Sequence, residues 1–215
     1  FDPKSHGGSG KLPWQGVGWY RRTLKLDAAD AGKCVFLDFD GVMASPKVYV
    51  NGHFAGGWDY GYASFRVDAT PFVKFGENNV IAVRASTLDH RSRWYPGAGI
   101  YRKVVMKMRN KAHFAHNGIY VTTPVASKDA ATVRIAWELE GSVPDDALVR
   151  VAVRGPEKGA DPKIWGSFKA RSGGMMGRVE KPALWDVDAP NLYELELMLW
   201  SEKTGQTLSR ERVRF

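Results

Sequence analysis

The sequence predicts an all-β protein made of two β-sandwiches. Apolar and polar residues alternate over many short segments, and Gly, Pro, Asn and Asp interrupt them about every 8–12 residues. No sustained 3.6-residue period occurs before residue 110, which argues against helices there. The 215 residues suit one large or two modest domains.

The first domain is expected to span residues 1–110. Its clearest strand is 47–50, because the Asn51-Gly52 dipeptide after it is a strong signal for a tight hairpin turn. Residues 71–74 are too few for more than one helical turn. Strands are expected at 17–27, 33–39, 47–50, 53–55, 64–67, 79–86 and 101–108.

The second domain is expected to span residues 111–215. The polar stretch Arg109–Gly118 predicts the border, with His113 and His116 as linker residues. About seven short strands in roughly 100 residues are typical of an immunoglobulin-like sandwich, here without the antibody cysteine pair. Strands are expected at 119–123, 131–140, 147–154, 165–167, 177–179, 192–200 and 210–215.

The net charge of +8 is concentrated in the first domain. Residues 1–110 carry 16 Lys and Arg against 9 Asp and Glu, whereas residues 111–215 carry 15 against 14. Such an excess suits nucleic acid, but the cations are interspersed along strands and no recognition helix is visible. A solvated face, or a face that docks on an acidic neighbour, is the favoured interpretation.

The sequence contains no motif for a membrane span, a metal site or a bound cofactor. No run of about 18 apolar residues is present, so no membrane span is predicted. Cys34 is the single cysteine and is expected to act as a small buried hydrophobe, and the five His show no metal spacing. No phosphate loop, dinucleotide fingerprint or nucleophile elbow occurs, so no cofactor is expected.

Two glycine–aromatic loops are the candidate functional segments. In residues 92–102, Pro96, Gly97 and Gly99 shape a loop that would project Arg93, Trp94 and Tyr95 from the end of a sheet. In residues 56–62, Trp58 and Tyr60 would either stack on a sugar or close the end of the sandwich, and closure is favoured.

One pair of carboxylates has a spacing that could suit catalysis. Asp38 and Asp40 are two apart on one strand, and paired carboxyls across a cleft hydrolyse glycosides. Their face also carries Phe36 and nothing marks a cleft, so they are interpreted as turn or rim acids. The pairs Glu138/Glu140 and Glu194/Glu196 are interpreted as solvent-facing.

Five motifs in order resemble the amino-terminal region of glycoside hydrolase family 2, the β-galactosidase, β-glucuronidase and β-mannosidase group. They are residues 16–22 (GVGWYRR), 39–42 (FDGV), 48–52 (VYVNG), 76–84 (GENNVIAVR) and 92–102 (SRWYPGAGIYR). Residues 111–215 resemble the immunoglobulin-like domain that follows, with 189–193 (APNLY) as a corner. The resemblance implies a jelly-roll (galactose-binding-like) domain that lacks its first strands, and then an immunoglobulin-like β-sandwich.

The family pattern places both catalytic glutamates in a C-terminal (β/α)₈ barrel that this chain does not reach, so no catalytic residue is expected here. The resemblance implies a non-catalytic part of a retaining exo-β-glycosidase, foremost a β-galactosidase acting on terminal β-galactosides. It favours a periplasmic or extracellular location over a cytoplasmic one, and it leaves a homo-oligomer open.

In that family the loop before Gly-Ile-Tyr-Arg reaches the active site, which here implies a substrate-contacting loop with Arg93, Trp94 and Tyr95. Some members place an aspartate on this loop against the terminal sugar. The matching residue here is Arg93, and Asp89 is the nearest carboxylate. An arginine there would bind sugar hydroxyls or an anionic group.

Two other functions stay open. An autonomous carbohydrate-binding module would bind sugar through Trp58, Tyr60 or Trp94. A nucleic-acid binder, ranked last, would show strongly salt-dependent binding.

Overall fold

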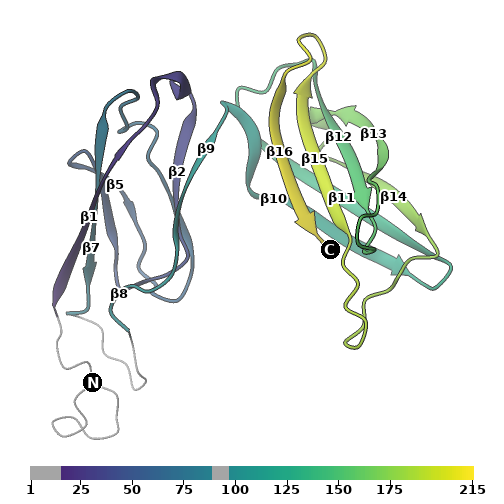
Figure 1. Ribbon diagram of the computed structural model, residues 1–215, viewed down its shortest axis with the longest axis horizontal. Coiled ribbons are helices and arrows are strands. Elements are labelled where there is room, and N and C mark those ends of the chain that lie inside the picture. The colour runs from purple at the N-terminus through teal and green to yellow at the C-terminus, as the bar shows by residue number, and fades with distance from the viewer. Residues whose placement is uncertain (1–15, 89–96) are drawn as a thin grey trace, which may run out of the picture. The chain divides into compact units, whose positions relative to one another are not determined.

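The computed structural model describes residues 16–88 and 97–215 and is all-β, as predicted (Figure 1). The chain divides after Met108 into two compact units, here called unit 1 and unit 2. Each unit is a β-sandwich with its own apolar core. No helix in the two described ranges is long and apolar enough to span a bilayer.

Unit 1 stacks a four-stranded sheet, β1-β7-β4-β5, on a three-stranded sheet, β6-β2-β9, and adds the small pair β3-β8. The elements are β1 (Val17–Lys25), the 3₁₀ turn η2 (Ala28–Asp30), β2 (Cys34–Phe39), β3 (Val42–Met43), β4 (Lys47–Val50), β5 (His53–Gly57), β6 (Phe65–Asp68), β7 (Asn78–Ser86), β8 (Gly99–Ile100) and β9 (Val104–Arg109).

Alternation explains the unit 1 core. Val48 and Val50 of β4 are fully buried, whereas Lys47 and Tyr49 on the other face are exposed and half-buried, respectively. The turn between β4 and β5 is the predicted Asn51-Gly52 dipeptide, with φ of 52° and 85°. These positive angles match the twist of the hairpin.

A buried amide fixes that turn to the rest of unit 1. Asn79 is fully buried; its Oδ1 accepts hydrogen bonds from Asn51 Nδ2 (2.8 Å) and from the Lys74 N–H (2.7 Å). Its Nδ2 donates to the Lys74 carbonyl at 2.8 Å. The side chain therefore replaces backbone pairing where the chain bends.

Unit 2 stacks the sheet β10-β11-β14 on the sheet β13-β12-β15-β16. The elements are β10 (Ala112–Ala126), β11 (Ala130–Gly141), β12 (Ala147–Arg154), β13 (Lys163–Lys169), the 3₁₀ turn η3 (Ala170–Ser172), β14 (Gly174–Glu180), β15 (Glu194–Ser201) and β16 (Thr207–Arg214). As predicted from the alternation, Leu195, Leu197 and Leu199 all point inward and are 0% exposed. Trp137 lies 3% exposed in the core and donates its Nε1–H to the Ala170 carbonyl at 2.9 Å.

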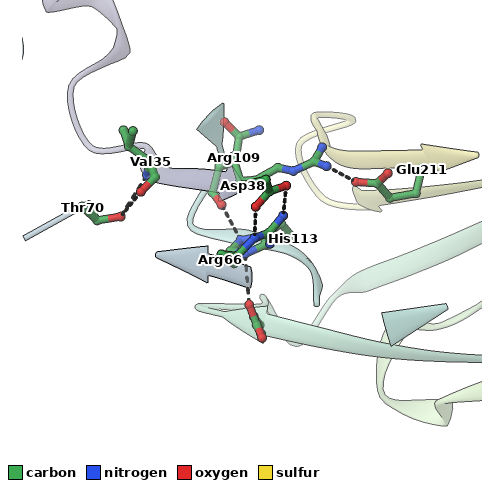
Figure 2. Close-up of polar contacts among 9 residues, drawn as sticks. Val35, Asp38, Arg66, Thr70, Arg109, His113 and Glu211 are labelled. Carbon is green, nitrogen blue, oxygen red and sulfur yellow. Dashed lines mark hydrogen bonds and ion pairs between the residues drawn. The ribbon is translucent and has the colours of Figure 1, made fainter. Parts of the chain in front are cut away.

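The interpretation of His113 and His116 as linker residues is wrong. β10 begins at Ala112, and Ala112, His113 and Phe114 are 3–4% exposed. The His113 Nδ1 lies 2.8 Å from the Asn110 carbonyl oxygen and its Nε2 lies 3.3 Å from the Glu140 carboxylate, which lets the strand bury an imidazole (Figure 2). His116, in contrast, lies on an exposed part of the strand.

Candidate functional site

The candidate site is a pocket of about 490 Å³ in unit 1. Three segments form it: the residues between β3 and β4, the loop after β5, and the carboxyl end of β7. The lining residues are Ala44, Ser45, Lys47, Asp59, Tyr60, Gly61, Tyr62, Arg84, Ser86 and Leu88.

Glycine and tyrosine hold the loop after β5 in place. Gly61 is buried so tightly that a Cβ there would collide with the Met43 side chain. The Tyr101 hydroxyl donates a hydrogen bond to the Gly61 carbonyl at 2.9 Å. At the loop's start, the Trp58 N–H donates to the Pro46 carbonyl at 3.2 Å. The aromatic side chains of the loop are thus displayed from a fixed backbone.

Both described flanks of the predicted substrate-contacting loop are held in place, and one of them lies at this pocket. Leu88, which precedes the loop, lines the pocket, and Thr87 is tied to Gly16 through a 2.9 Å backbone bond. On the other flank β8 pairs with β3, and the Ile100 N–H donates to the Tyr20 hydroxyl at 3.3 Å. The predicted residues Asp89, Arg93, Trp94 and Tyr95 themselves lie outside the described residues.

The structure separates the two predicted sugar-stacking residues. Tyr60 lines the pocket, is 63% exposed and meets the Tyr62 ring edge-on at 5.8 Å. Trp58 is 46% exposed, does not line the pocket and lies parallel to the Phe65 ring at 6.3 Å. Because Phe65 stacks in turn on buried Phe39 at 4.7 Å, Trp58 extends the core outward.

The pocket holds polar groups of both signs. Lys47 and Arg84 point into it from neighbouring strands, since Lys47 is paired with Arg84 in the β4–β7 register. Asp59 faces them from the loop. Neither cation forms an ion pair with a carboxylate of residues 16–88 or 97–215. The arrangement suits hydrogen bonding to hydroxyls or to an anionic group.

Sequence reasoning did not single out Lys47, Arg84, Tyr62 and Ser86 as pocket residues. The signal for Arg84 and Ser86 was the alternation of β7, which places residues 80, 82, 84 and 86 on one face. What brings this face together with the loop after β5 is long-range pairing, which leaves no local pattern.

Asp38 is not a turn or rim acid, contrary to the sequence interpretation. It lies within β2 and is 14% exposed, and its carboxylate accepts hydrogen bonds from Arg66 Nε (2.6 Å) and Nη2 (2.9 Å) (Figure 2). Lys107 Nζ lies 3.0 Å from the same carboxylate. Burial alone would raise the pKa of Asp38, but the hydrogen bonds and charges of Arg66 and Lys107 outweigh it and lower the pKa to about 2.

This environment keeps Asp38 ionised at neutral pH, so it cannot serve as a general acid. Asp40 follows the strand and is exposed. In the described part of the chain, no three His, Cys, Asp or Glu side chains converge as a metal ion would require.

Comparisons with known proteins match both units. The family model "Glycosyl hydrolases family 2, sugar binding domain" matches residues 12–122, and the model "Glycosyl hydrolases family 2" matches residues 112–215. Beta-galactosidase BoGH2A of Bacteroides ovatus is 38% identical over 196 residues, which cover 87% of this chain and 23% of that protein.

Solved structures agree with these matches. A beta-glycosidase from Bacteroides vulgatus superposes with a TM-score of 0.86 at 31% identity, over 100% of this chain and 27% of its own. The beta-glucuronidase of Bacteroides uniformis superposes with a TM-score of 0.77 at 27% identity, over 94% of this chain and 26% of its own. The chain thus spans about a quarter of each of these relatives.

Proposed function

The chain belongs to glycosyl hydrolase family 2, and we propose that it acts as the non-catalytic amino-terminal part of a retaining exo-β-glycosidase that hydrolyses terminal β-galactosides. The observation that carries this proposal is the match of the two family models, in chain order, to the two sandwiches. In the proposed enzyme, a (β/α)₈ barrel outside these 215 residues carries the glutamate acid/base and the glutamate nucleophile.

The proposed role of unit 1 is to lend the segment 89–96 to the rim of that active site. Its support is the fixed geometry of both flanks, with Leu88 in the pocket wall and β8 bonded to β3 and to Tyr20. Arg93, Trp94, Tyr95 and Asp89 are the proposed contacts with the terminal sugar, and Tyr60 is a neighbouring stacking surface. Positioned polar groups of this kind raise the rate by orienting the substrate.

A second substrate class is a β-glucuronide. The similarity to BoGH2A favours galactosides. Arg93, however, stands where an aspartate contacts the sugar in some family members, and a guanidinium there would bind a carboxylate with two parallel hydrogen bonds. The Bacteroides uniformis relative is a beta-glucuronidase.

The test compares the complete product of the source gene with the 215-residue chain, using nitrophenyl β-galactoside and nitrophenyl β-glucuronide. We expect turnover only from the complete product, with the higher kcat/KM on the galactoside. A higher value on the glucuronide would replace the first substrate class by the second.

The rim role has its own test. Arg93→Ala in the complete product is expected to raise KM about tenfold, the loss of one strong hydrogen bond, whereas Arg91→Ala in the same segment is the matched control. Equal KM for both variants would remove Arg93 from the site.

If the source gene encodes only these 215 residues, the enzyme interpretation fails and an autonomous carbohydrate-binding module replaces it. That module would bind sugar through Trp58, Tyr60 or Trp94, and loss of binding in Tyr60→Ala is the readout.

A further inference from the structure

The outer face of the four-stranded sheet of unit 1 carries an aromatic strip that the proposed function does not use. Residues paired across antiparallel strands point to the same face. Trp19 of β1 is paired with Arg84 of β7, and Tyr49 of β4 is paired with Ala82 of β7 and with Phe54 of β5. All five side chains therefore share this face.

Three rings form the strip. The Trp19 and Tyr49 centroids lie 5.7 Å apart, and the Tyr49 and Phe54 centroids lie 5.6 Å apart. Trp19 and Tyr49 are two strands apart, and the small Ala82 on the strand between them leaves room for the rings to approach. Trp19 is 57% exposed and Phe54 is 56% exposed, so a large apolar area faces outward.

Cations surround the strip. Arg21, Lys47 and Arg84 share the face, and none of them forms an ion pair with a described carboxylate. On the opposite sheet of unit 1, by contrast, Arg66 and Lys107 both pair with Asp38. The outer face thus holds three cations that form no ion pair with a described carboxylate.

The surface is also hollowed. A shallow depression of about 700 Å³ lies over β1, β7 and β4, with Trp19, Arg21, Tyr49 and Lys74 in its wall. Its polar groups are mostly donors, and the backbone of the sheet beneath it is already paired. A ligand for it needs flat apolar faces for the rings and anionic groups for the cations.

We propose that this face binds an anionic oligosaccharide, one whose sugar rings stack on Trp19 and Phe54 and whose carboxylate or sulfate groups meet Arg21. A single-stranded nucleic acid has the same two properties. The match of residues 12–122 to a sugar binding domain favours the glycan.

This site is separate from the rim site and does not depend on the reaction of the parent protein. Tyr60, Tyr62 and Leu88 belong to the pocket alone, and Trp19, Arg21 and Tyr49 belong to the sheet depression alone. Variants of the two sets therefore distinguish the two proposals.

The experiment is calorimetric titration of the 215-residue chain with three probes: tetragalacturonic acid, its methyl ester and a sulfated heparin tetrasaccharide. The methyl ester keeps the rings and removes the charge. We expect at least one anionic probe to bind, and we expect the methyl ester to bind about tenfold more weakly than the acid when the acid is the ligand.

Two substitutions locate the site. Trp19→Ala and Arg21→Gln are each expected to weaken binding about tenfold. Trp185→Ala, which removes a tryptophan that is 60% exposed in unit 2, and Arg134→Gln, which removes an exposed arginine of β11, are matched controls and should leave the affinity unchanged. Circular dichroism checks that all four variants are folded.

Three results would overturn the proposal. The first is that neither anionic probe binds. The second is that binding survives Trp19→Ala but is lost in Tyr60→Ala, which assigns the sugar to the pocket and leaves the proposed function intact. The third is tighter, Trp19-dependent binding of oligothymidylate, which replaces the glycan by a nucleic acid.

Discussion

The two units are both β-sandwiches, but they differ in how their surface cations are paired with carboxylates. Residues 1–108 carry 15 Lys and Arg against 9 Asp and Glu, and residues 109–215 carry 16 against 14. In unit 2 several arginines pair with glutamates across strands, as in Arg212–Glu196 at 2.8 Å and Arg154–Glu194 at 3.2 Å. In unit 1 the outer face of the four-stranded sheet holds Arg21, Lys47 and Arg84, which form no ion pair with a described carboxylate.

Unit 1 also brings exposed aromatic rings together. Trp19, Phe54 and Tyr60 of unit 1 gather over one sheet face and its neighbouring pocket. Unit 2 pairs several of its charges across strands and suits the role of a scaffold, whereas unit 1 presents groups that suit a ligand. If this comparison holds, the two units should unfold independently, and buried polar groups and ion pairs should contribute differently to the stability of each.

The largest expected effect is the truncation of a core leucine. Leu197 of unit 2 is 0% exposed and Leu37 of unit 1 is 2% exposed. Changing either to Ala should cost about 2–5 kcal/mol through lost burial and a residual cavity. Hydrogen exchange should show that Leu197→Ala weakens protection at Val133 but not at Val48, and that Leu37→Ala does the reverse.

The control is Leu184→Ala, because Leu184 is 40% exposed and should cost less than about 1 kcal/mol. Equal loss of protection in both units from one core substitution would show that they unfold as a single body, and the comparison would lose its basis.

The second effect concerns the buried amide of unit 1. Asn79→Ala leaves the Lys74 N–H, the Lys74 carbonyl and Asn51 Nδ2 without this partner. Each unsatisfied buried group is costly, and we expect a loss of about 3 kcal/mol by urea unfolding. The matched variant is Asn191→Ala in unit 2, whose exposed bond to the Leu184 carbonyl (2.9 Å) should be worth about 1 kcal/mol. Similar losses for the two variants would contradict the assigned role of Asn79.

The third effect is a pH dependence carried by Asp38. Its pKa is about 2 in the folded protein against an ordinary 3.8, because the bonds and charges of Arg66 and Lys107 outweigh its burial. A lowered pKa stabilises the folded state above the unfolded value, and this contribution disappears as the pH falls from about 4 to about 2. The shift corresponds to about 2 kcal/mol.

Other carboxylates titrate in the same range, so the measurement is the difference between wild type and Asp38→Asn in unfolding free energy at pH 5 and at pH 2. The stability advantage of the wild type over the variant should shrink by about 2 kcal/mol across that window. A constant difference would mean that the ion pairs of Asp38 do not form in solution.

The elements that could be predicted are those whose signal is local. The predicted bounds of β4 and β12 match the observed ones, Lys47–Val50 and Ala147–Arg154, because alternation specifies both strands and an Asn-Gly turn also marks the end of β4. The buried leucines of β15 were predicted for the same reason.

The features that the sequence does not predict depend on partners that are distant along the chain. β3 and β8 have two residues each and exist only because they pair with one another across more than fifty residues. The sequence around His113 predicts an exposed linker residue, because its partners Asn110 and Glu140 cannot be recognised from local pattern. The sequence around Asp38 predicts a rim acid, because Arg66 and Lys107 approach it from other strands. The candidate pocket could not be predicted as a unit for the same reason.

The smallest expected effect concerns a surface ion pair of unit 2. Arg178 Nε lies 2.6 Å from Glu180 Oε1, and the two side chains are 67% and 68% exposed. Water screens such a pair and holding two long side chains together costs entropy, so Glu180→Gln should change the unfolding free energy by no more than about 0.5 kcal/mol. Urea unfolding at low and at high salt measures this change, with Asp38→Asn as the partly buried counterpart.

An effect of Glu180→Gln as large as that of Asp38→Asn would mean that the surface pairs of unit 2 act as a coupled network. Unit 2 would then depend on its charges for stability, and the ion pairs on its surface would be a requirement of folding.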